Sequence, residues 1–162
     1  MDWNQKVKEA LDRTEFMVIS TIGPDGSWTC PVQFGHSNKL DLYFRSLVHA
    51  KHMLDLQNDD RVSVAIFSTE RFPNSRDVMG LQLKGRARIL DDRVGVEEAA
   101  RHMYGKDQRE IDYRTKIDEH LGNSMWKVVK IVPNEAWCFD TRVFGEERRR
   151  IDLTSLQLHL KY

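Results

Sequence analysis

Hydrophobic and polar residues alternate in short runs along the chain, and the clearest pattern lies between residues 40 and 67. Leu40, Leu42 and Phe44 alternate with Asp41, Tyr43 and Arg45 at the two-residue period of a half-buried strand. Leucine and methionine recur at helical spacing over 47–56, and a β-branched apolar run follows at 62–67. This segment therefore predicts a strand, a short helix and a second strand.

Other parts of the chain carry comparable patterns. Residues 3–12 place apolar side chains three to four positions apart, which predicts an amphipathic helix. Gly23-Pro24-Asp25-Gly26 is a turn signal between two β-prone runs, so an antiparallel hairpin is expected. The remaining expected elements are strands 16–22, 28–34 and 81–90, helices 94–104 and 108–121, an exposed loop at 68–78, and a last pair of strands, 125–132 and 135–140.

Three positions indicate where the strand ladders are irregular. Pro31 lacks an N–H group, so its strand is expected at a sheet edge or beside a bulge. Gly85 lies within a long alternating strand, where a bulge or a close backbone approach is expected. Pro133-Asn134 is expected to separate the last two strands.

The expected elements amount to about six strands, mostly antiparallel neighbours, with helices inserted between them. This order favours a closed or partly closed antiparallel β-barrel with peripheral helices over a doubly wound α/β sheet. No Gly-x-Gly-x-x-Gly follows a strand, and most connections are too short for a crossover helix, which excludes a Rossmann fold. All of residues 1–162 are expected to form one domain.

Charge and composition narrow the function classes. The 25 basic and 25 acidic residues balance, so no global field favours nucleic acid or an acidic membrane. No apolar run reaches the roughly 18 residues of a membrane helix. Cys30 and Cys138 form no CxxC pair, which argues against a zinc cluster. We therefore expect a cytoplasmic protein that binds neither nucleic acid nor membranes.

The candidate chemistry lies where the first strand of 40–67 gives way to its helix. Arg45 and Ser46 are expected at the end of the strand, with Lys51 and His52 one helical turn further on. Backbone N–H groups, a hydroxyl and cationic side chains would then point at one anion. The pattern predicts a phosphate site.

Simpler interpretations of the same residues stay open. Lys51 and His52 also fit a solvated helix surface, and Ser46 also fits a helix N-cap. His49 and His52 share a helix face but lack a third ligand, so no metal site is expected. Cys30 is expected to be a small buried apolar side chain. The sequence shows no catalytic triad or carboxylate pair, so catalytic residues are not assigned.

The order of these motifs resembles the pyridoxamine 5′-phosphate oxidase-like family, the FMN-binding split barrels, over roughly residues 10–140. The motifs are Lys51 on its short helix, Leu-Tyr-Phe-Arg-Ser at 42–46, Asn-Asp-Asp-Arg-Val-Ser-Val at 58–64 and Gly-Leu-Gln-Leu-Lys-Gly-Arg-Ala at 80–87. The resemblance implies a six-stranded antiparallel split β-barrel, a homodimer, and FMN in a groove at the dimer interface.

Carried over position by position, the resemblance implies that Arg45, Ser46, Lys51 and His52 meet the FMN phosphate. The family's basic strand corresponds to about Cys30 to Gly35, which holds no Arg or Lys. Gln33 and the nearby backbone would then meet the ribityl chain or the ring edge, and Gln82 would bond the isoalloxazine. The implied cofactor-binding residues are Pro31, Val32, Gln33, Phe34, Arg45, Ser46, Lys51, His52 and Gln82.

The implied function is that of a small FMN-dependent oxidoreductase, in which the flavin supplies the hydride or electron transfer. A reduced pyridine nucleotide or another small molecule would be the electron donor. The chain ends without the Trp and Arg-Leu-x-Pro-like segment of the true oxidases, so pyridoxamine phosphate is not the expected substrate.

Two alternatives stay open. One is a protein that binds or senses a flavin, a deazaflavin (F420) or haem without turnover, with His36 or His49 as the axial haem ligand. The other is a structural or stress-response dimer with a vacant groove.

Overall fold

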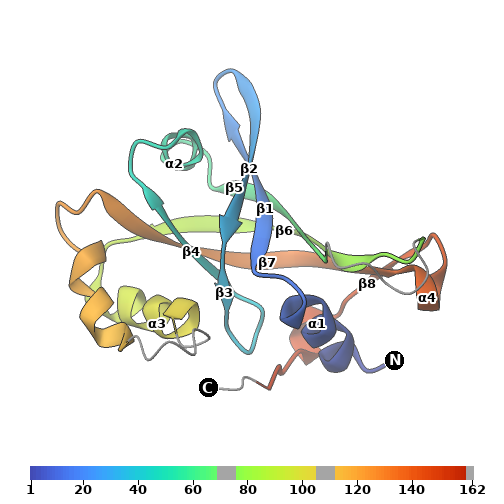
Figure 1. Cartoon of the computed structure of the whole chain (residues 1–162). Helices are drawn as coiled ribbons and strands as arrows, with labels where there is room; N and C mark the ends of the chain where they lie inside the picture. Colours follow the sequence, from blue (N-terminus) through green and yellow to red (C-terminus); the bar gives the residue numbers. More distant parts are fainter. Residues whose placement is uncertain (69–75, 105–111, 160–162) are drawn as a thin grey trace.

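The computed structural model describes residues 1–68, 76–104 and 112–159, which include eight strands (Figure 1). The strands are β1 (Phe16–Gly23), β2 (Gly26–Gln33), β3 (Gly35–His36), β4 (Leu42–Leu47), β5 (Arg61–Phe67), β6 (Met79–Leu90), β7 (Trp126–Asp140) and β8 (Arg148–Arg150). The helices are α1 (Trp3–Asp12), α2 (Lys51–Leu56), α3 (Arg93–Tyr104) and α4 (Thr141–Phe144), with 3-10 turns η1 (Tyr113–Lys116), η2 (Asp118–His120) and η3 (Leu153–Ser155).

The strands form one antiparallel sheet in the order β2-β1-β5-β6-β7-β4-β3, with β8 added beside β7. β2 and β3 follow each other in the chain across Phe34 but occupy opposite ends of this order. The sheet must therefore curl until its two edges approach each other. This confirms the expected mainly-β split barrel: β1, β2 and β4 to β7 are its six long strands, and β3 and β8 are short additions.

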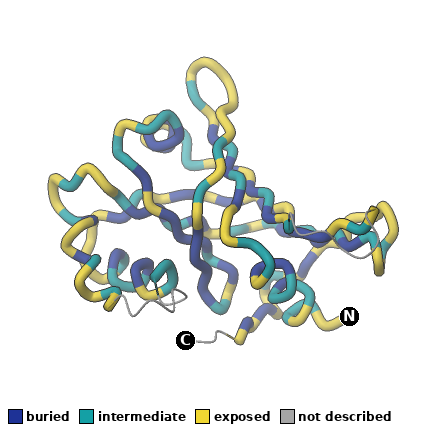
Figure 2. Tube along the Cα trace, viewed as in Figure 1, coloured by how far each residue is buried: buried dark blue, intermediate teal, exposed yellow. Residues whose placement is uncertain are grey.

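The concave side of the sheet holds the main core (Figure 2). Because side chains alternate along a strand, Met17 and Ile19 of β1 face the same side as Ile66 of β5 and Leu81 of β6. All four side chains are fully buried, each contributing about 1.5–3 kcal/mol of hydrophobic stabilisation. α1 adds its apolar face, Val7, Ala10 and Leu11, to this core.

The convex side of the sheet has two parts. At the β4 end, α3 and η2 cover Tyr43 and Val128, which form a second core cluster with Val96 and Ile117. The helices that contact β2, β1, β5 and β6, namely α1 and α2 (Lys51–Leu56), lie on the other side, because their apolar residues join the main core. The remainder of the convex side lies across these four strands. We call this remainder the open sheet face, defined by Val18, Ser20, Ser63, Ala65, Gln82 and Lys84.

Two predictions are wrong for the residues that the structure describes. Where a helix was predicted over 108–121, residues 112–121 form two 3-10 turns, and 105–111 lie outside the described residues. The Asp112 carboxylate accepts from the backbone N–H of Arg114, and its carbonyl accepts from Thr115, so local turn bonds replace helical ones. Pro133-Asn134 does not separate two strands either, because β7 runs through it without a break. Of the loop expected at 68–78, residues 69–75 also lie outside the description.

Pro133-Asn134 instead forms a bulge opposite Gly85. Lys84 pairs with Glu135 and Gly85 with Pro133, so Asn134 is the extra residue. A Cβ atom on Gly85 would lie 2.5 Å from the carbonyl oxygen of Val132. The predicted bulge at Gly85 is therefore confirmed, and so is the edge position of Pro31, since β2 ends the sheet order. In addition, no described helix is long and apolar enough to cross a membrane.

Replacing Gly85 should loosen the bulge. Gly85→Ala is expected to lower the free energy of unfolding by about 1–3 kcal/mol, because the new methyl group meets backbone atoms that have no room to move. Gly95→Ala in α3 is the matched control, since the three atoms nearest its Cβ all belong to the Asp92 side chain, which can move, and alanine favours helix. Urea unfolding of both variants measures the difference, and equal stabilities would contradict the steric argument.

Stability should also fall as the pH drops from about 7 to 5. Burial lowers the pKa of His52, His102 and His120, so the unfolded chain binds protons there more readily than the folded one. Each such histidine contributes at most about 1.4 kcal/mol per pH unit to the slope. His120→Phe keeps a ring stacked on Tyr104 and removes one titrating group. Urea unfolding at several pH values should show a shallower slope for this variant, and an unchanged slope would contradict the assignment.

Candidate functional site

α2 is held against β1 by a buried carboxylate. Asp55, 2 % exposed, accepts hydrogen bonds from the Thr21 hydroxyl at 2.8 Å and from the Lys51 ammonium at 2.5 Å. These bonds, led by that of Lys51, hold the pKa of Asp55 below its usual value. Gly23 leaves the necessary space, because a Cβ atom there would overlap the Asp55 carboxylate. Lys51 is therefore engaged with a buried anion.

His52 connects α2 to two strands. Its Nε2 lies 2.8 Å from the Ser46 hydroxyl on β4, and its Nδ1 lies 3.2 Å from the Cys30 sulfur on β2. His52 and Ser46 are each 8 % exposed, and Cys30 is half-buried. Burial lowers the pKa of His52, against the opposing effect of Asp55, so the ring is neutral near pH 7. We call Cys30, Ser46, Lys51, His52 and Asp55 together the α2 junction.

The start of α2 differs from the expectation. β4 continues through Ser46 to Leu47, where Ser46 pairs with Lys127, and the helix begins only at Lys51. Ala50 is the N-cap and makes no side-chain bond, so the N-cap interpretation of Ser46 is wrong. The turn between strand and helix nevertheless folds His52 back onto Ser46, which lies six residues earlier.

Arg45 does not join this group. It is exposed on the other face of β4 from Ser46, with its guanidinium carbon 4.9 Å from the centre of the Trp126 ring. Of the four residues predicted to meet a phosphate, the structure thus brings Ser46 and His52 into contact. Lys51 lies next to His52 on α2, with its ammonium group bonded to Asp55.

The remaining predicted residues lie on β2, directly after it, and on β6. Val32 and Phe34 pack into the main core, and the N–H of Phe34 donates to the carbonyl of Glu15. By strand alternation, Pro31 and Gln33 face the convex side. Cross-strand pairing places Pro31, Val18, Ala65 and Gln82 in one row across four strands. Three strand spacings of about 4.8 Å separate Pro31 from Gln82, or about 14 Å.

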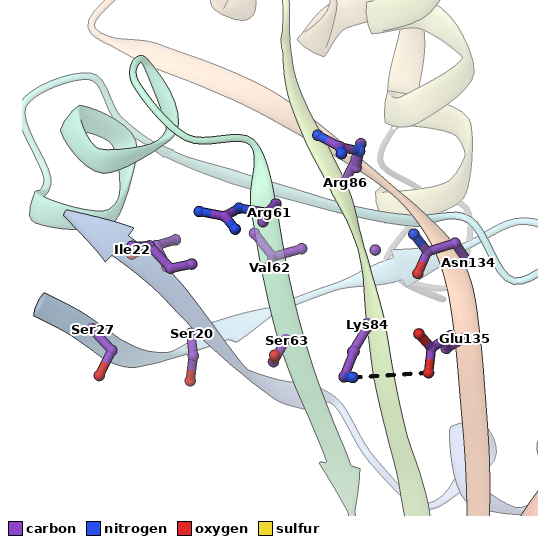
Figure 3. Close-up of a pocket in the computed structure, with 12 residues that line it drawn as sticks. Ser20, Ile22, Ser27, Arg61, Val62, Ser63, Lys84, Arg86, Asn134 and Glu135 are labelled. Atoms are coloured by element: carbon purple, nitrogen blue, oxygen red, sulfur yellow. Dashed lines mark ion pairs between the residues drawn. The ribbon is translucent and has the colours of Figure 1, made fainter.

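A groove of about 310 Å³ opens on the convex side, next to the row that holds Gln82 (Figure 3). Lys84 contacts Glu135 at 3.9 Å within it. Arg61 pairs with Asp59, whose pKa it lowers to about 2, and Arg86 pairs with Asp60. The groove is lined by Ser20, Thr21, Ile22, Ser27, Arg61, Val62, Ser63, Lys84, Gly85, Arg86, Asn134 and Glu135. Its hydroxyl and cationic groups suit a polar or anionic ligand.

The groove was missed at the level of sequence, although one signal was present. Lys84, Arg86 and Arg88 alternate with apolar residues along one strand, which places three cations on one face. The serines of β1 and β5 that lie beside them give no such signal, because strand pairing alone brings them there.

The positions of the histidines are relevant to metal and haem binding. Among the described residues, no group of three or more His, Cys, Asp or Glu side chains is placed to hold a metal ion. His36 is buried, with its Nδ1 3.1 Å from the carbonyl oxygen of Ser37. His49 is exposed in the turn before α2, whereas His52 is turned toward Ser46 and Cys30.

Comparison with solved structures finds the same fold in several bacterial proteins. A conserved hypothetical protein from Mycobacterium tuberculosis superposes with a TM-score of 0.71 at 15 % identity, covering 94 % of this chain and 92 % of that one. General Stress Protein 26 from Bacillus anthracis gives 0.62 at 17 % identity, covering 93 % and 100 %. A haem-binding protein from Mycobacterium smegmatis gives 0.70 at 14 % identity, covering 93 % of this chain and 58 % of that one.

Sequence comparison gives the family. No curated protein matches the chain. The sequence profile of the family described as Pyridoxamine 5′-phosphate oxidase matches residues 3–137, which is most of the chain and includes the α2 junction and the strands of the open sheet face. Together with the curled antiparallel sheet, this match shows that the chain belongs to the pyridoxamine 5′-phosphate oxidase-like family.

Proposed function

We propose that this protein binds FMN, with the phosphate at the α2 junction, and acts as a small oxidoreductase. The observation that carries the proposal is the contact between Ser46 of β4 and His52 of α2, beside Cys30 on the edge strand β2. Lys51 precedes His52 in the first turn of the same helix. The family membership supports the same cofactor and site.

The donor groups at the junction are suited to bind a phosphate group with modest affinity. An ammonium group carries three N–H donors, and Lys51 directs one of them at Asp55, so others are available to an anion. The Ser46 hydroxyl and the first-turn N–H groups of α2 add neutral donors. Because His52 is neutral and Asp55 offsets Lys51, little net positive charge gathers there. Binding would therefore depend more on hydrogen bonds than on charge.

When bound, FMN supplies the hydride or electron transfer, and the chain's task is to hold and orient the ring. Gln82 is the residue we propose to hydrogen bond the isoalloxazine, with Pro31 and Gln33 beside the ribityl chain. All three lie on the convex side of the sheet, whereas Ser46 and Cys30 of the α2 junction face the concave side. FMN bound at both places would therefore pass over the edge strand β2. A reduced pyridine nucleotide or another small electron donor would reach the ring from this side.

We further propose that a second copy of the chain covers the open sheet face, so that the cofactor lies between two protomers. Large apolar side chains are exposed there, including Phe16 at 55 %, Ile22 at 41 % and Phe67 at 44 %. Exposed apolar groups gathered around a polar groove are typical of a surface that is buried in an assembly.

Haem is the second candidate ligand. One structural relative is a haem-binding protein, and His49 is an exposed imidazole close to α2 that is available as an axial ligand. A deazaflavin (F420) is a third ligand that the same measurements would detect.

The first experiment is an absorption spectrum of the purified protein, followed by titration with FMN while the flavin fluorescence is recorded. Flavin bands or saturable quenching would support the proposal. A haem Soret band would show that haem is the cofactor. If the fluorescence of F420 is quenched on binding and that of FMN is not, F420 is the cofactor. A colourless protein that binds none of the three would overturn the proposed function.

Lys51→Ala should weaken FMN binding about 5- to 150-fold, equivalent to about 1–3 kcal/mol for a lost charge-assisted hydrogen bond. Lys8→Ala is the matched control, because Lys8 and Asp12 form the same i, i+4 pair on α1, away from the junction. The fluorescence titration compares the two variants. Equal affinities would remove Lys51 from the site without affecting the dimer proposal.

The dimer proposal predicts a mass near twice 19.0 kDa by light scattering at micromolar concentration. Ala65→Arg should shift the protein toward the monomer, because Ala65 lies at the centre of the open sheet face between Val18 and Gln82. Val94→Arg is the control, since this α3 residue is 79 % exposed and lies away from that face. A wild-type monomer would contradict the proposed interface.

A further inference from the structure

The contact between Cys30 and His52 has a chemistry of its own, separate from cofactor binding. A nucleophile within hydrogen-bond reach of a base, with the base oriented by a third group, is the arrangement that activates a thiol. Here the Cys30 sulfur lies 3.2 Å from His52 Nδ1, and His52 Nε2 lies 2.8 Å from the Ser46 hydroxyl. Three elements, β2, α2 and β4, each supply one member.

The state of each group decides how the thiol reacts. Burial raises the pKa of the Cys30 thiol, so little of it is thiolate at pH 7. Burial also keeps His52 neutral, which leaves one ring nitrogen able to accept a proton. When Nε2–H donates to Ser46, Nδ1 is the acceptor and faces the thiol. The pair is therefore an uncharged thiol beside its base.

The surroundings allow a small reactant to reach this thiol. Cys30 is half-buried on β2, an edge strand whose outer side has no partner among the described strands. The charged group that acts on His52 is Asp55 of α2, whose carboxylate is paired with Lys51. β1 contributes the Thr21 hydroxyl, and Arg45 of β4 points to the opposite face from Ser46.

We propose that Cys30 is a peroxide-reactive thiol, with His52 as its proton acceptor and Ser46 as the residue that positions the imidazole. The sulfur attacks one oxygen of a hydroperoxide, so an S–O bond forms and the O–O bond breaks. The thiol proton passes to Nδ1 of His52 and then to the departing oxygen, which leaves as water or an alcohol. The sulfur is oxidised by two electrons to a sulfenic acid, and the peroxide is reduced by two.

A base that can return the proton explains why a hydroperoxide suits this pair. The departing oxygen must be protonated, and His52 holds a proton beside it once the thiol has been deprotonated. The role does not depend on FMN or on the proposed dimer, so it stands or fails separately from the proposed function.

Cys138 supplies an internal control. It is fully buried, and burial, helped by Asp140, raises the pKa of its thiol to about 11. It should stay unmodified as long as the protein is folded. Reaction at Cys138 would therefore reveal a variant whose fold has loosened.

The test treats the whole protein with hydrogen peroxide and traps sulfenic acid with dimedone, between about pH 5.5 and 9. Peptide mass spectrometry then gives a rate for each cysteine. For the wild type we expect labelling of Cys30 alone. The labelling rate should decrease at pH values below the pKa of His52, where the imidazole is already protonated. In His52→Gln the rate at pH 7 should fall about tenfold or more, and it should rise about tenfold per pH unit with the thiolate fraction.

Ser46→Ala provides the second variant, because it retains the imidazole and removes only its 2.8 Å partner. We expect a severalfold slower reaction with the pH profile of the wild type. Cys30→Ser should abolish the signal. The proposal is overturned if Cys30 reacts no faster than its thiolate fraction allows. It is also overturned if His52→Gln, with Cys138 still unmodified, keeps the wild-type rate and pH profile.

Discussion

The ladder between β6 and β7 is the constraint on which the rest of the structure depends. It runs from Leu90 opposite Val128 to Met79 opposite Asp140, and it joins the two halves of the sheet. A ladder of this length accumulates twist, and the bulge at Asn134 bends it further. The resulting curl lets β2 and β3, at opposite ends of the sheet, remain joined through a single residue, Phe34.

That curl also separates the two sides of the molecule. Concave side chains meet in the main core, which α1 closes, while the convex side keeps a polar groove and an uncovered surface. The α2 junction lies against β1 and β2, where the Asp55 carboxylate bonds to Thr21 of β1 and to Lys51 of the same helix. Asp55 fixes α2 and at the same time neutralises Lys51. The charge that would draw a phosphate is thus partly used to hold the helix in place.

His52 illustrates how one side chain can belong to a structural and a chemical network together. Its bonds to Ser46 and Cys30 connect three elements and fix the ring, while burial lowers its pKa and keeps it neutral. A neutral imidazole is a poor phosphate ligand but a good proton acceptor. The proposed cofactor role of the junction therefore falls mainly to Ser46 and Lys51, and the proposed thiol chemistry to His52.

Sequence alone determined the elements whose signals are local. Alternation, Gly-Pro-Asp-Gly, the missing N–H of Pro31 and the isolated Gly85 predicted the long strands, the hairpin, the edge and the bulge, because each depends on neighbouring residues. The 3-10 turns after Asp112 were not predicted, because local capping bonds outweighed the helical periodicity there. The continuous strand β7 was not predicted either, because pairing with β6 outweighed the turn tendency of Pro133-Asn134.

The tertiary structure alone decided how the candidate residues are grouped. The sequence placed Arg45 with Ser46, but strand alternation puts them on opposite faces of β4. It gave no reason to connect Cys30 with His52, because their contact depends on α2 folding back over β2. The cationic groove likewise needed the register of β1, β5, β6 and β7. Such contacts join residues distant in the chain, so they are set by the curl of the sheet and not by any local pattern.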